Sequence, residues 1–200
     1  MRRLLLLLVL ACLLLASCVQ PASFELTQSR QPYCEYRGEP GTQFVVLMAQ
    51  AVPSASQLPC IELLPAGWTV SDVFVRNGRA RFALNSDRVG MHAVQVVLER
   101  TCQFGDAKAT RVPSDEPGTR RFEQIGEVRP GVGFTGTRFY LFQGGCVTYQ
   151  FRFNGEDRAR PIGEVTLSLS FVTRDAIQRL VQETTHGRAD LDTTTEAASR

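Results

Sequence analysis

Apolar and polar residues alternate over several short stretches of this chain, and such alternation predicts β-strands. The clearest case is residues 69–84, where Asn77-Gly78 favours a two-residue type I′ turn. We expect residue 75 to face 80 and residue 73 to face 82 across this turn. The apolar face then holds Val73, Val75, Ala80, Phe82 and Leu84, and the polar face holds Asp72, Phe74, Arg76, Arg79 and Arg81. A β-hairpin is predicted, and residues 91–102 supply a third strand.

A second meander is predicted around Gly144-Gly145. Pairing across these glycines gathers five apolar side chains on one face: Tyr140, Phe142, Val147, Tyr149 and Phe151. Such a face is typical of a hydrophobic core, because each ring buries a large apolar area. Residues 164–172 alternate again and predict a strand with one solvated side. Residues 44–49 form a short, partly β-branched apolar run that also predicts a strand.

The last periodic segment has helical spacing. Thr173 can cap a helix, and Asp175 follows where the helix dipole favours an anion. The expected fold class is α+β: a mainly antiparallel β-sheet of two β-meanders, in a two-layer or sandwich arrangement, with a C-terminal amphipathic helix. Val-Pro-Ser precedes each meander, at residues 52–54 and 112–114, so an internal duplication is one interpretation.

The start of the chain has a different pattern. Arg2 and Arg3 precede an apolar run of 13 residues, which is shorter than the ~20 residues that cross a bilayer as a helix, so a signal peptide is predicted. The run ends in Leu15-Ala16-Ser17-Cys18, which resembles the lipobox of bacterial prolipoproteins. The resemblance implies cleavage before Cys18, lipid on its sulfur with acyl chains such as palmitate, and a place on the extracytoplasmic face of a bacterial membrane. An ordinary secreted protein and an uncleaved anchor are the alternatives.

Four segments are therefore expected along the chain. They are a lipoprotein signal peptide (1–17), a lipid-anchored flexible tether (18–33), a single disulfide-containing β-rich domain (34–185) and a disordered tail (186–200). The tether and the tail contain too few large apolar residues to form a core of their own.

The charge balance and the cysteine count limit the ligands and cofactors that can be expected. Removal of Arg2 and Arg3 leaves 20 basic residues against 20 acidic ones, so no overall field attracts nucleic acid. The cysteines expected to remain free of lipid are Cys34, Cys60, Cys102 and Cys146. Two disulfides are predicted, with their pairing open. The cysteines are too widely spaced for a zinc cluster, and neither a metal nor another cofactor is expected.

No catalytic arrangement is visible in the sequence. His92 is expected on the face of Val94 and Val96 at the start of a strand, and His186 falls in the predicted tail. The paired acids Asp115-Glu116 and Glu156-Asp157 lie in predicted loops.

The candidate binding residues are Arg76, Arg79 and Arg81, with Phe74 beside them. Grouped guanidinium groups can bind phosphate or carboxylate through paired hydrogen bonds. A solvated hairpin tip is the structural alternative.

The expected function is that of a membrane-anchored extracytoplasmic lipoprotein, a non-catalytic binding or accessory module at the bacterial cell envelope. Its expected partners are the membrane, through the lipid anchor, and an envelope protein, an anionic lipid or a wall polymer; nucleic acid is not expected. Two alternatives stay open. One is an envelope hydrolase that uses acids such as Asp115, Glu116, Glu156 or Asp157, and the other is a carrier with an apolar cavity between the sheet and the last helix.

Overall fold

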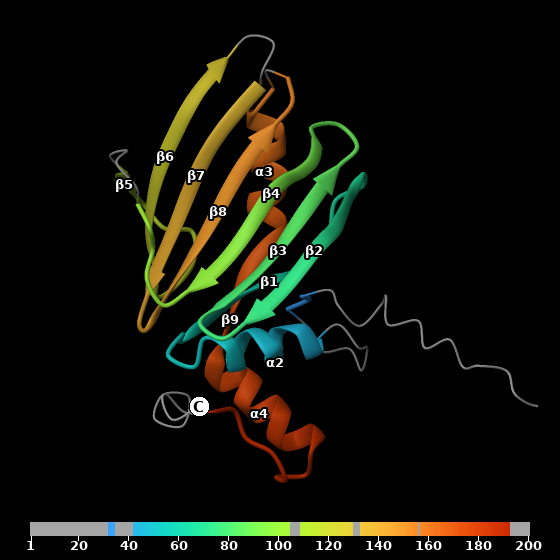
Figure 1. The fold of residues 1–200 in the computed structure, drawn as a ribbon, viewed down its shortest axis with the longest axis vertical. Helices are drawn as coiled ribbons and strands as arrows, with labels where there is room; N and C mark the ends of the chain where they lie inside the picture. Colours follow the sequence, from blue (N-terminus) through green and yellow to red (C-terminus); the bar gives the residue numbers. More distant parts are fainter. Residues whose placement is uncertain (1–31, 35–41, 105–108, 130–132, 156, 193–200) are drawn as a thin grey trace, which may run out of the picture.

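The computed structural model describes residues 32–34, 42–104, 109–129, 133–155 and 157–192. At its centre is a seven-stranded antiparallel sheet with the strand order β2-β3-β4-β8-β7-β6-β5 (Figure 1). Its strands are β2 (Trp68–Arg76), β3 (Arg79–Ser86), β4 (Gly90–Glu99), β5 (Thr110–Val112), β6 (Arg120–Arg129), β7 (Gly133–Phe142) and β8 (Gly145–Phe153). Two meanders, β2-β3-β4 and β6-β7-β8, meet where β4 pairs with β8.

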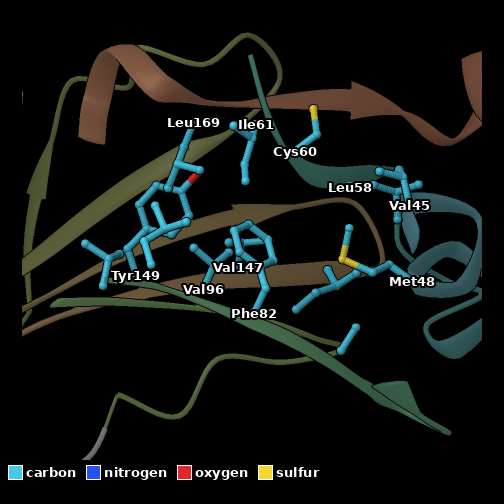
Figure 2. Close-up of a cluster of buried hydrophobic side chains, with 14 of the residues drawn as sticks. Val45, Met48, Leu58, Cys60, Ile61, Phe82, Val96, Val147, Tyr149 and Leu169 are labelled. Atoms are coloured by element: carbon cyan, nitrogen blue, oxygen red, sulfur yellow. The ribbon is translucent and has the colours of Figure 1, made fainter. Parts of the chain in front are cut away.

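A second layer packs on one face of this sheet. It contains a two-stranded sheet of β1 (Gln57–Ile61) and β9 (Leu169–Thr173), together with α3 (Ala159–Ser168), which leads into β9. In Figure 1, α3 lies behind the large sheet, and α2 (Thr42–Ala51) and α4 (Arg174–Thr184) lie at its lower end. Figure 2 shows Leu169 and Ile61 of the small sheet pointing toward the large one, with Leu169 beside Tyr149. The expected α+β class, mainly antiparallel β with a C-terminal helix, is confirmed.

We call the side of the seven-stranded sheet that packs on this layer the covered face. Val96, Val147 and Tyr149 point to it and are buried. We call the other side, to which Gln95, Thr137 and Gln150 point, the open face. Among the described residues, no helix of the second layer packs on the open face (Figure 1).

The first hairpin forms at the predicted turn. Arg76 pairs with Arg79, and Val75 with Ala80. The predicted register holds as far as Phe74, which pairs with Arg81; a bulge between Ser71 and Phe74 then interrupts the ladder where residue 73 was expected to face residue 82. Val73 and Val75 still pack against the core, as their alternation predicts.

For the second meander, the predicted hairpin is confirmed, but the predicted third strand is wrong. Phe142 pairs with Gly145, and Tyr140 with Val147. The predicted aromatic face lies toward the core. The third strand, however, is β6, which precedes the hairpin, and the predicted strand at 164–172 does not join the large sheet. The two meanders are therefore not built from the corresponding segments on which the idea of a duplication depended.

Two predicted strands are largely helical. Residues 44–49 lie in α2, where Phe44, Val45, Met48 and Ala49 are buried. Their spacing, i, i+1, i+4 and i+5, is that of one helix face, and this packing outweighs the β-branched composition.

Residues 164–168 continue α3, and only residues 169–173 form a strand. The hydroxyl groups of Thr166 and Ser168 donate to the carbonyls of Ile162 and Glu164, at 2.8 and 2.6 Å, within the helix. Leu167, an apolar position of the alternation that predicted a strand here, is 82% exposed.

The C-terminal helix begins as predicted. The Thr173 side chain accepts a hydrogen bond from the backbone N–H of Ala176, and Asp175 lies in the first turn. Ordered contacts extend beyond the predicted domain boundary at 185. Leu191 is buried, and its N–H donates to the Gln178 side chain at 2.8 Å.

The two predicted disulfides pair Cys34 with Cys60 and Cys102 with Cys146, whose Cα atoms lie 4.8 and 5.4 Å apart. None of the helices in the described ranges has the length and apolar character needed to span a bilayer. The predicted signal peptide, Cys18 and the tether up to residue 31 lie outside the described residues.

Candidate functional site

A row of polar side chains crosses the middle of the open face. Gln95 of β4 pairs with Gln150 of β8, which pairs with Thr137 of β7, which in turn pairs with Gln124 of β6. Neighbouring strands lie about 4.8 Å apart, so the row is about 14 Å long. It lies in a hollow of about 560 Å³ whose lining also includes His92, Thr135, Arg152 and Ile125.

One end of the row is bounded by Phe104. The disulfide between Cys102 and Cys146 attaches the segment after β4 to β8. Phe104 then packs on Phe139, with ring centroids 4.7 Å apart, and accepts a hydrogen bond from the Gln124 side chain at 2.6 Å. The segment that carries Phe104 is therefore held in place beside the Gln124 end of the row.

His92 lies at the edge of the same hollow and pairs with Asp72 of the β2 bulge. Both residues have left-handed backbones, with φ of 50° and 48°. The expectation that His92 points with Val94 and Val96 is wrong, because the left-handed turn at His92 interrupts the alternation of β4. A positive φ strains the backbone of a residue other than glycine, and here two residues whose side chains contact each other both adopt it. Such strain is common near binding and active sites.

Several polar groups in the hollow have no partner within the described residues. The side chains of Gln95 and Gln150 make no hydrogen bond there, and Arg152 has no acidic partner. A carboxamide offers two N–H donors and a carbonyl acceptor. Gln95, Gln150 and Arg152 can therefore bind a polar ligand without first breaking contacts within the described fold.

Positive charge predominates over the whole open face. The described strand side chains on this face include two acids, Asp72 and Glu99, and six arginines: Arg76, Arg79, Arg81, Arg111, Arg120 and Arg152. Within the described residues, Arg79 alone of the six has an acidic partner, Glu99 at 3.1 Å.

The predicted binding residues all lie on this face. Arg76 is opposite Arg79, and the guanidinium group of Arg81 lies over the Phe74 ring, 5.2 Å from its centroid. The Arg81 Nε atom is buried and has no hydrogen-bond partner among the described residues. The structure places this group on β2 and β3, beside the hollow and not within its lining.

On the covered face, in contrast, Arg138 and Asp115 bond to neighbouring side chains, although the buried Tyr149 hydroxyl has no hydrogen-bond partner among the described residues. Arg138 is 6% exposed; its Nε donates to Glu123 at 2.8 Å and its Nη1 to the Thr166 hydroxyl at 2.9 Å. Asp115 pairs with Arg121 at 2.8 Å and accepts from the Tyr140 hydroxyl at 2.9 Å. Burial by itself would raise the pKa of Asp115, but these two hydrogen bonds hold it below the ordinary value.

The pKa of Glu116 is shifted in the opposite direction, upward. Burial raises its pKa to about 7; a hydrogen bond from Ser170 partly offsets this effect, and the charges of Asp115 and Glu62 add to it. Both acids face the covered side, whereas His92 lies on the open face. Asp157 is exposed, and Glu156 lies outside the described residues. The described acids among the hydrolase candidates therefore do not converge on His92.

A smaller hollow of about 170 Å³ separates the large sheet from α3. Apolar Phe134, Phe151 and Ile162 line it together with charged Glu123, Arg138 and Arg158. It lies beside α3, whereas the carrier hypothesis required an apolar cavity between the sheet and the last helix, α4.

Comparisons of this chain with protein-family models, curated proteins and solved structures found no match. The assignment of function therefore depends on the chemistry of the open face. Sequence reasoning identified the arginines of the first hairpin but missed Gln95, Gln150, Thr137 and Arg152. Their alternation with buried residues was visible, but their alignment follows from pairing between distant strands.

Proposed function

We propose that this protein is a lipid-anchored binding module of the bacterial envelope, whose open face binds an anionic wall polymer. The anchor at Cys18 and the tether at 18–33 are inferred from the lipobox resemblance. The bound polymer is inferred from the charge and the shape of the open face.

The observation that carries the proposal is the uneven distribution of charge. The whole chain has 22 basic and 20 acidic residues, which is close to balance. The open face nevertheless has six arginines and two acids among its described strand residues. Because guanidinium groups bind carboxylate and phosphate through paired hydrogen bonds, this face is complementary to an anionic polymer.

The arrangement of the arginines favours a long ligand over a compact one. They extend from β2, at one edge of the sheet, to β5 at the other. A single small anion would contact one or two of them, whereas a polymer lying across the strands can contact most. Arg76, Arg120 and Arg152 are exposed, so their head groups are accessible to such a chain.

The test is co-sedimentation of the full-length lipidated protein, held in neutral detergent micelles, with purified cell-wall material at low and high salt. The open-face variant is Arg76→Ser/Arg81→Ser/Arg120→Ser. The matched control, Arg160→Ser/Arg179→Ser/Arg188→Ser, removes the same charge from exposed helical and C-terminal positions. Vesicles of anionic and of neutral lipid form two further arms.

We expect salt-sensitive binding to wall material that weakens about tenfold or more in the open-face variant and little in the control. Equal loss in both variants would show that overall charge, and not this face, causes binding. Binding to anionic vesicles alone, or no binding to either material, would overturn the proposal.

A further inference from the structure

We infer that the polymer is an acidic glycan, with sugar hydroxyl groups bound by the Gln95-Gln150-Thr137 part of the row and a sugar carboxylate bound by Arg152. This inference rests on the proposed function, because it names the chemical class of the polymer at the same face.

Neutral polar side chains outnumber charged ones in the lining of the hollow. Five of the eleven described lining residues carry an amide or a hydroxyl group, and Arg152 is the one arginine among them. A ligand recognised by charge alone, such as a polyphosphate, would gain little from carboxamides. A sugar hydroxyl both donates and accepts, and a carboxamide offers both functions within one group. The neutral floor therefore indicates a ligand that carries hydroxyl groups.

The row also has the dimensions of a chain ligand. Gln95, Gln150 and Thr137 come from three adjacent strands, so their side chains recur about every 4.8 Å across the sheet. Arg152 lies two residues beyond Gln150 on the same strand and pairs with Thr135. This places the cation about 7 Å to the side of the row. A glycan lying along the row can thus present an acidic substituent to Arg152.

The surroundings of the row are fixed before any ligand binds. Beside Gln124, Phe104 is held by its packing on Phe139 and by the nearby disulfide. At another side, the Asn85 side chain accepts hydrogen bonds from the His92 N–H at 2.8 Å and the Ser71 hydroxyl at 3.0 Å. Ile125, which is 67% exposed, adds an apolar rim on which a sugar ring can pack. Preorganisation of this kind lowers the entropic cost of binding.

The experiment is calorimetric titration of the full-length protein, held in neutral-lipid nanodiscs, with three probes of similar length. They are a hexamer of galacturonate, its fully methyl-esterified form and hexaglutamate. The galacturonate hexamer has both hydroxyls and carboxylates, the ester lacks the charge, and hexaglutamate lacks the hydroxyls. We expect the galacturonate hexamer to bind about tenfold or more tightly than either of the others.

Two variants locate the contacts. Gln95→Leu/Gln150→Leu should weaken binding of the galacturonate hexamer about tenfold and leave hexaglutamate unchanged. Arg152→Gln should remove the difference between the acid and its ester. Gln143→Leu, an exposed residue at the turn after β7, is the matched control, and Gln95→Ala/Gln150→Ala serves if the leucine variant does not fold.

Equal affinity for hexaglutamate and the galacturonate hexamer would overturn the glycan inference and leave the charge-based function in place. Failure of the galacturonate hexamer to bind would also overturn it. Loss of the proposed function is recognised separately, by the absence of salt-sensitive sedimentation with wall material.

Discussion

The two faces of the seven-stranded sheet carry similar polar side chains in different surroundings. On the covered face, Arg138 contacts Glu123 and Thr166. On the open face, Arg152 has no acidic partner, and Gln95 makes no side-chain hydrogen bond within the described residues. Because burial requires polar groups to be paired, the covered network serves the fold. The unpaired groups of the open face are available for recognition.

The largest expected effect comes from breaking the covered network. Arg138→Met should lower the free energy of unfolding by about 3–5 kcal/mol, because it leaves the Glu123 carboxylate without its closest cation. Arg152→Met, on the open face, should change it by less than about 0.5 kcal/mol. Urea unfolding of both variants measures the difference. Similar losses in the two would contradict the division between the faces.

A smaller effect on stability is expected from removing the disulfide on the open face. The double variant Cys102→Ser/Cys146→Ser removes a cross-link between residues that are 44 positions apart in the sequence. This loss should lower the free energy of unfolding by about 2–4 kcal/mol. Cys34→Ser/Cys60→Ser, in the second layer, should cost a similar amount. Removal of the first pair alone should also weaken binding of the galacturonate hexamer, because that disulfide holds the segment whose Phe104 carbonyl accepts a hydrogen bond from Gln124 of the row. Calorimetry measures binding and urea unfolding measures stability, and equal loss of binding in both variants would argue against a role for this segment.

The smallest expected effect concerns Glu116. Because its pKa is raised from 4.5 to about 7 in the folded protein, the unfolded chain releases this proton first as the pH rises. Stability from the protonated group is thus present below about pH 4.5 and is lost between there and about pH 7. Glu116→Gln should remove this loss and stabilise the protein by about 1 kcal/mol at about pH 8, after allowance for solvent screening.

Urea titrations across this pH range test the Glu116 prediction. The variant and the wild type should converge at acidic pH and separate at alkaline pH. Glu183→Gln, at an exposed position of α4, is the control. A constant difference at every pH would show that Glu116 acts through packing and not through its proton.

Local signals in the sequence predicted the parts of the fold that depend on neighbouring residues. Asn77-Gly78 and Gly144-Gly145 fixed two hairpins, because a tight turn aligns the strands on either side of it. Thr173 likewise marked the start of α4. These features need no knowledge of distant contacts.

Features set by tertiary packing were not predicted. Val45 and Val46 favoured a strand, but contacts on one face of α2 decided the helix. Leu167 alternates with its neighbours in the sequence and yet points outward from α3. The arginines of the candidate site could be assigned to one face from their alternation. The Gln95-Gln150 alignment could not, because it depends on pairing between β4 and β8, which lie far apart in the chain.

The attachment of the first described residues determines where mechanical load would enter the protein. The N–H of Cys34 donates to Ile61 at 2.9 Å, and the N–H of Ile61 donates to Pro32 at 2.7 Å, beside the Cys34–Cys60 bridge. A pull transmitted through the proposed tether would therefore reach β1 and be resisted by a covalent bond. The strands of the open face lie in the other sheet, so a ligand bound there would be outside the path of this load.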